Sequence, residues 1–102
     1  MKPEYKLLIT YDILPDKQDS YYRYVLGEFV PALRTMGVHM TSAWHTAYGK
    51  YPARLLEFTI ESHDIWRRAR NSVRWNKLED RLQTFTTAYQ RKLIRYRDAF
   101  QF

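Results

Sequence analysis

Residues 6–14 read Lys-Leu-Leu-Ile-Thr-Tyr-Asp-Ile-Leu, an alternating run that predicts a β-strand. Successive side chains of a strand point to opposite faces of its sheet. One face of this strand therefore receives apolar side chains (Leu7, Ile9 and Tyr11), and the other receives a mixed set (Leu8, Thr10 and Asp12). The pattern predicts a sheet that is fully covered on one face only.

Residues 54–60 repeat this division. Their apolar set is Leu56, Phe58 and Ile60, and their mixed set is Leu55, Glu57 and Thr59. Two further strands are predicted over residues 38–48, which Gly49 ends with a turn, and over residues 89–96.

Helical spacing occupies the segments between these strands. Apolar residues recur at that spacing from Tyr22 to Met36, where Pro31 is expected to bend the helix. Ser62 is expected to cap a short helix, and Ser72 a second one. The second helix carries a regular apolar stripe of Trp75, Leu78, Leu82 and Phe85.

The resulting order is strand, helix, strand, strand, helix, strand. Two split β-α-β units of this kind predict an α+β, ferredoxin-like β-α-β-β-α-β sandwich with a four-stranded antiparallel sheet and helices on one face. Residues 1–102 are expected to form a single domain. Because no helix covers the mixed sheet face, we expect two copies to pack these faces together as a homodimer.

Three segments resemble the dimeric α/β-barrel superfamily, and in particular its NIPSNAP-like and stress-responsive members. They are Gly37 with the run Trp44-His-Thr-Ala-Tyr-Gly49, the run Ser62-His-Asp-Ile-Trp-Arg-Arg-Ala69, and the helix start Ser72-Val-Arg-Trp75. The resemblance implies a homodimer whose two sheets form a barrel, with a small-molecule cavity between the sheet and helices of each subunit. The superfamily includes cofactor-free monooxygenases, haem-handling enzymes and members without known activity.

Composition excludes several classes of protein. The 45% apolar content is too high for a disordered chain, and the absence of cysteine excludes disulfides and thiolate metal sites. No apolar run approaches the ~20 residues of a membrane span. We expect a cytoplasmic protein with no membrane partner.

The net charge of +6 arises entirely from residues 63–102. The basic residues there follow the polar positions of helices rather than a continuous run, so a solvated face is favoured over a nucleic-acid site. We expect no sequence-specific binding of nucleic acid.

Four aromatic residues are predicted to converge between the sheet and the helices, where they would line a ligand pocket or fill the core: Tyr11, Trp44, Phe58 and Trp75. His45 and Tyr11 are the candidate catalytic residues, since imidazole titrates near neutral pH.

Metal binding is not expected. His39 and His45 are predicted on one strand face, but six residues span ~20 Å, which is too far for two ligands of one ion. No Gly-rich phosphate loop is present, and no cofactor is predicted. Asp12 and Glu57 fall on the uncovered face, where salt bridges, with Arg95 and Arg97 available, are favoured over acid–base chemistry.

The leading functional hypothesis is a small homodimeric barrel that binds an apolar or aromatic small molecule. The first alternative is a cofactor-independent monooxygenase or isomerase-type enzyme that uses His45 or Tyr11. The second is a structural or regulatory dimer without a ligand, which a filled interior would favour.

Overall fold

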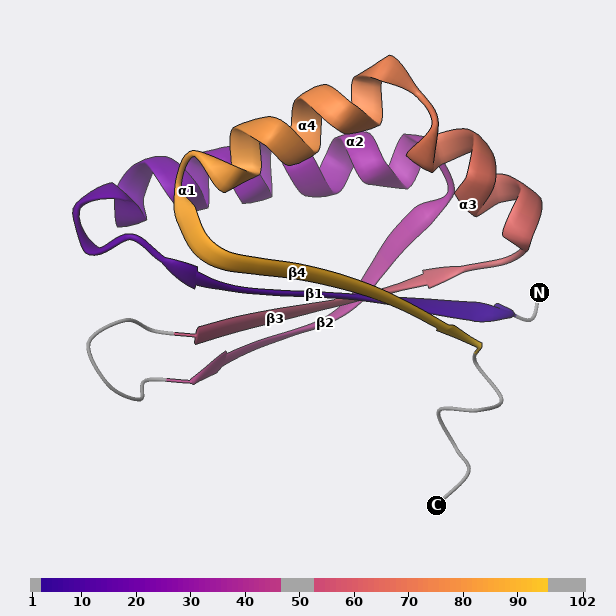
Figure 1. Ribbon diagram of the computed structural model, residues 1–102, viewed down its shortest axis with the longest axis horizontal. Helices are drawn as coiled ribbons and strands as arrows, with labels where there is room; N and C mark the ends of the chain where they lie inside the picture. The colour runs from indigo at the N-terminus through magenta and orange to yellow at the C-terminus, as the bar shows by residue number, and fades with distance from the viewer. Residues whose placement is uncertain (1–2, 47–52, 96–102) are drawn as a thin grey trace.

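The sheet has the strand order β2-β3-β1-β4, and all neighbouring strands are antiparallel. A computed structural model describes residues 3–46 and 53–95. The strands are β1 (Tyr5–Ile13), β2 (Val38–Thr46), β3 (Ala53–Ile60) and β4 (Thr86–Arg95). Figure 1 shows the helices on one side of this sheet. The predicted ferredoxin-like fold class is confirmed.

Within the described part of the chain, the helical layer contains six short segments. The first connection holds η1 (Pro15–Lys17), α1 (Gln18–Tyr24), η2 (Val25–Phe29) and α2 (Val30–Thr35); the second holds α3 (His63–Arg70) and α4 (Val73–Gln83). None of the helices in residues 3–46 and 53–95 is both long and apolar enough to cross a membrane.

Pro31 does not end the run of helical segments between β1 and β2. Its ring nitrogen cannot donate the usual hydrogen bond, and the preceding segment η2 adopts π-helical geometry. This widened turn changes which side chains face the sheet. Leu26, predicted to belong to the apolar stripe, is 63% exposed, whereas Tyr21, Tyr24 and Val25 are buried.

Serine caps set the boundaries of α3 and α4 as predicted. Ser62 Oγ accepts a hydrogen bond from the Ile65 amide at 3.3 Å, and Ser72 Oγ accepts one from the Trp75 amide at 3.0 Å. Each cap satisfies an amide that has no partner within its helix. The break between them lets α4 turn its stripe, with Trp75 and Leu82 fully buried, onto the sheet.

The core lies between the helices and the covered sheet face. The predicted apolar sets of β1 and β3 are buried there: Leu7, Ile9, Tyr11, Leu56, Phe58 and Ile60. Their neighbours Leu8, Thr10, Leu55 and Glu57 are half-buried on the other face, which we call the open face. The face assignments of these two strands are therefore confirmed.

Bulges interrupt both outer strands. The pairing of β2 with β3 shifts between Met40 and Ser42, and the pairing of β4 with β1 shifts where β1 passes from Thr10 to Asp12. Because side chains alternate with a period of two, one extra residue reverses the faces of everything beyond it. These reversals determine the composition of the candidate site.

Candidate functional site

Three residues from three strands form one row across the covered face. The register pairs His45 on β2 with Arg54 on β3, and Arg54 with Tyr11 on β1. Adjacent strands lie about 4.8 Å apart, so the backbones of His45 and Tyr11 are roughly 10 Å apart with Arg54 between them. The fold thus places the two predicted catalytic residues in one row, with exposed His45 at one end, buried Tyr11 two strands away, and the Arg54 guanidinium on the strand between them.

The β4 bulge adds Tyr89 to this row. Asp12 pairs with Thr87 and Thr10 pairs with Gln90, which leaves Ala88 and Tyr89 opposite Tyr11 alone. Ala88 has φ +55°, the left-handed conformation found at bulges. The extra residue places Tyr89 on the covered face, where its ring stacks on Tyr11 at 6.3 Å between centroids and 8° between planes.

A buried pair of phenols, Tyr11 from the row and Tyr21 from the helix above it, lies beside Arg54. The hydroxyls of Tyr11 and of Tyr21, from α1, are 2.5 Å apart, and both residues are almost inaccessible to solvent. Burial is the main cause that raises the pKa of each phenol, because the ionised form is poorly solvated there. Tyr11 is therefore a neutral hydrogen-bonding group at physiological pH and cannot act as a ready base.

Arg54 lies beside these phenols. Its guanidinium carbon is 5.5 Å from the centre of the Tyr22 ring, in a cation–π arrangement. Its charge lowers the pKa of Tyr21 against the larger raising effect of burial. The Arg54 Nε–H is buried and has no acceptor. A buried donor without a partner is costly, so an acceptor oxygen brought to this position would stabilise the protein.

The carboxylate of Glu79 holds the hydroxyl of Tyr89. The Tyr89 hydroxyl donates to Glu79 Oε2 at 2.7 Å, and Arg91 Nη1 donates to the same oxygen at 2.6 Å. Burial and the bond to Glu79 raise the pKa of Tyr89. The Arg91 guanidinium also lies over the rings of Trp66 and Trp75, at 5.5 and 5.8 Å. These contacts attach α4 to β4 and hold Tyr89 against Tyr11.

The four predicted pocket residues do not share one environment. Tyr11 belongs to the row, while Phe58 and Trp75 are fully buried core side chains. The Trp75 indole N–H is buried without an acceptor. The predicted placement of Trp44 between sheet and helices is wrong: it pairs with Leu55 on the open face and is 49% exposed. The β2 bulge causes the difference, and it also separates His39, on the open face, from His45.

Sequence reasoning missed Tyr21, Arg54 and Tyr89. Arg54 had a usable signal, because a short connection between β2 and β3 places it opposite residues near the end of β2. Tyr89 had none, since its face depends on the bulge at Ala88.

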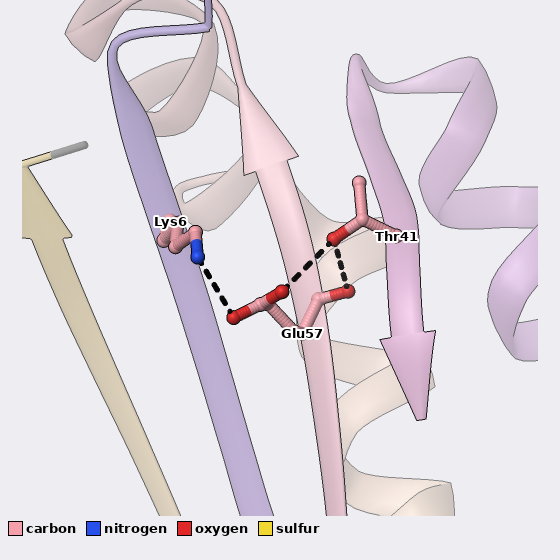
Figure 2. Close-up of polar contacts among 3 residues, drawn as sticks. All are labelled: Lys6, Thr41 and Glu57. Atoms are coloured by element: carbon pink, nitrogen blue, oxygen red, sulfur yellow. Dashed lines mark hydrogen bonds and ion pairs between the residues drawn. The ribbon is translucent and has the colours of Figure 1, made fainter. Parts of the chain in front are cut away.

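Polar groups also cross the open face. Figure 2 shows Lys6 on β1, Glu57 on β3 and Thr41 on β2 joined in one network. Lys6 Nζ lies 3.1 Å from Glu57 Oε1, and Thr41 Oγ1 donates to the Glu57 backbone carbonyl at 3.2 Å and to its Oε2 at 3.4 Å. The side chains of Lys6 and Glu57 are only 17% and 14% exposed.

The expected partners of the open-face acids were arginines. Glu57 pairs instead with Lys6, because Arg95 lies opposite Tyr5 on the covered face. Arg97 lies outside the described residues. Asp12 lines a hollow of about 270 Å³ near the β4 bulge, together with Thr10, Tyr11, Ala53, Arg54, Leu55, Ala88 and Gln90. Within residues 3–46 and 53–95, no three His, Cys, Asp or Glu side chains cluster to hold a metal ion.

Several solved structures share the fold of this chain. A NIPSNAP family protein from Agrobacterium tumefaciens superposes with a TM-score of 0.68 over 93% of this chain and 87% of its own, at 14% identity. The chain has the fold of the dimeric α/β-barrel proteins. No protein-family model and no curated protein matches the sequence.

Two further structures with this barrel fold have names that mention an activity. A Bacteroides thetaiotaomicron protein of unknown function, described as a possible oxidoreductase, has a TM-score of 0.71 at 5% identity and covers 94% of this chain and 100% of its own. A monooxygenase from the gene ActVA-Orf6 of Streptomyces coelicolor, in complex with nanaomycin D, has a TM-score of 0.66 at 16% identity, covering 91% and 87%. At these identities the likeness concerns the fold.

Proposed function

We propose that this protein is a homodimeric barrel that binds a small aromatic molecule at the row of Tyr11, Arg54 and His45. The observation that carries this proposal is the buried, unpartnered Nε–H of Arg54 beside the buried Tyr11–Tyr21 pair. Ligand sites combine apolar and aromatic walls with a few converging polar groups. In the proposed complex the rings of Tyr11, Tyr22 and Tyr89 would supply the walls, and the unpartnered Arg54 Nε–H would supply the donor.

The open face supports the homodimer. It combines half-buried Leu8 and Leu55 with Trp44, which is exposed in the single chain, around the Lys6–Glu57 ion pair. Packing this face against a second copy removes the apolar area from water, which stabilises by ~25 cal/mol per Å². A twofold axis lets the same face serve both subunits.

Sedimentation equilibrium tests the assembly. At micromolar concentration the protein should have about twice its chain mass of 12.5 kDa. Leu55→Lys should weaken the dimer, because a charge would be buried at its centre. Leu26→Lys is the matched control, since Leu26 is exposed on the helical layer. A monomer at this concentration, or equal effects of the two variants, would contradict dimerisation through the open face.

Equilibrium titration with neutral aromatic probes such as 2-naphthol and benzamide tests the ligand site. Saturable binding of one molecule per chain is expected, and Tyr11→Phe should weaken it. Tyr5→Phe is the control, because Tyr5 lies on the same strand and covered face, outside the row, and its ring contacts His63. Absence of saturable binding by any aromatic probe would leave the structural or regulatory dimer as the better account.

A cofactor-independent oxygenase or isomerase is the second candidate function. The raised pKa of Tyr11 keeps a proton on its phenol, which could hydrogen-bond to an oxygen atom of a bound substrate. The fold shared with the nanaomycin D-bound monooxygenase also favours it. Oxygen consumption in the presence of dihydroxynaphthalenes, lost in Tyr11→Phe and kept in Tyr5→Phe, would support this activity. Binding without oxygen consumption would favour a binding protein.

A further inference from the structure

Among residues 3–46 and 53–95, no carboxylate forms an ion pair with the positive charge of Arg54. The described part of the chain contains three ion pairs, Lys6–Glu57, Arg67–Asp64 and Arg91–Glu79, and Arg54 belongs to none of them. The adjacent strand offers Asp12, which lines the same hollow as Arg54 but belongs to the open face and forms no ion pair with it, whereas Arg54 shares the covered face with Tyr11.

The described groups beside Arg54, which are three tyrosines and, across the strand pair, His45, carry no negative charge. Tyr11 and Tyr21 remain protonated because burial raises their pKa values, and Tyr22 offers only the face of its ring. Phenol oxygens and aromatic rings attract a guanidinium but do not neutralise it. A partly buried charge without a counter-charge is unfavourable, and the burial of Nε adds the cost of an unmade hydrogen bond.

Arg91 is an arginine on the same covered face whose charge is paired with a carboxylate. It also lies on the covered face, opposite Ile9, and its guanidinium also lies 5.5 Å from an aromatic ring, that of Trp66. It differs from Arg54 in having a carboxylate, Glu79, at 2.6 Å. The two residues therefore form a matched pair within one protein.

We propose that the ligand of the Tyr11–Arg54 row is an anion, namely a small aromatic carboxylic acid whose carboxylate pairs with Arg54. The proposal rests on the proposed function and specifies its ligand class. A planar guanidinium binds a carboxylate through two parallel hydrogen bonds, and Nε–H is one of the donors that can take part. The aromatic part of the acid would lie among the tyrosine rings of the row.

Matched acids and amides test the charge of the ligand. Benzoate and 2-naphthoate should bind at neutral pH about tenfold or more tightly than benzamide and 2-naphthamide, as expected for a charge-assisted contact. Arg54→Met should abolish this preference. Arg70→Met, which removes the same charge from an exposed position of α3, should retain it. Equal binding of acids and amides would overturn the anionic ligand and leave the proposed function standing, whereas binding of neither would overturn both.

A second test needs no ligand. Arg54→Met should leave the melting temperature of the free protein unchanged or raise it, because it removes an unbalanced charge and a buried unpaired donor. Arg91→Met should lower the melting temperature by several degrees, because it leaves Glu79 without its cation. A decrease in Arg54→Met as large as that in Arg91→Met would show that Arg54 is already balanced, and would overturn the proposal.

Discussion

The hydroxyl groups of Tyr11 and Tyr21 lie 2.5 Å apart and join strand β1 to helix α1 in the interior of the protein. Each hydroxyl is buried, so neither can replace its partner with bulk water. The pair therefore connects the helical layer to the sheet at the end where the candidate site lies. It also fixes the orientation of the Tyr11 ring that stacks on Tyr89.

Tyr11→Phe should destabilise the protein by about 1–3 kcal/mol, because it leaves the Tyr21 hydroxyl without its partner. Tyr21→Phe should have a similar effect. The double variant should lose less than the sum of the two, with a coupling of about 0.5 kcal/mol or more. Urea unfolding of the four proteins measures this cycle. Strict additivity would mean that the two hydroxyls do not interact.

Two glycines should respond oppositely to alanine. Gly37 has φ +83°, and a Cβ there would lie 2.6 Å from Ile65 Cγ2, so Gly37→Ala should destabilise by roughly 1–3 kcal/mol. Gly27 lies in η2 with no atom within 4 Å of a Cβ, so Gly27→Ala should be neutral or stabilise by up to about 1 kcal/mol. Chemical denaturation of both variants is the measurement. A tolerant Gly37 would mean that α3 packs differently against the end of α2.

Two tryptophans should differ in the size of the stability loss when each is replaced by alanine. Trp75 is 1% exposed between α4 and the sheet, so Trp75→Ala should cost about 3–5 kcal/mol in the free energy of unfolding. Trp44→Ala should cost below about 1 kcal/mol in a chain held monomeric by Leu55→Lys, because Trp44 is half exposed on the open face. A loss under 1 kcal/mol for Trp75→Ala would show that α4 is docked differently.

Alkaline pH should destabilise the protein through its buried phenols. Burial raises the pKa of Tyr24 to about 12, and it raises the pKa values of Tyr11, Tyr21 and Tyr89 as well. Above the unfolded value of about 10, the unfolded chain releases these protons while the folded chain keeps them. The stability present below pH 10 is therefore lost as pH rises, and for Tyr24 this loss occurs between about pH 10 and 12.

Denaturation at pH 9, 10 and 11 measures this loss, and absorbance near 295 nm follows tyrosinate formation. Each phenol that stays protonated contributes a slope of up to about 1.4 kcal/mol per pH unit. Tyr11→Phe should reduce the total slope. A stability that stays constant from pH 9 to 11 would mean that the four phenols are accessible to solvent in the folded protein.

The sequence alone determined the order of elements, the covered face of β1 and β3, and the serine caps of α3 and α4. These features depend on local patterns: a period of two in a strand, a period near 3.6 in a helix, and a short hydroxyl side chain at a helix start. Residues such as Leu7, Phe58 and Trp75 could be assigned to the core because nothing interrupts the pattern around them.

Only the tertiary structure decided which faces the outer strands present. The bulge between Met40 and Ser42 moves Trp44 to the open face and His45 to the row of Tyr11, and the bulge at Ala88 brings Tyr89 to the same row. A bulge arises where two twisted strands from distant parts of the chain must match. No residue type marks it in either strand alone. The partnership of Arg54 with buried phenols follows from that register, which is why the candidate site emerged only in three dimensions.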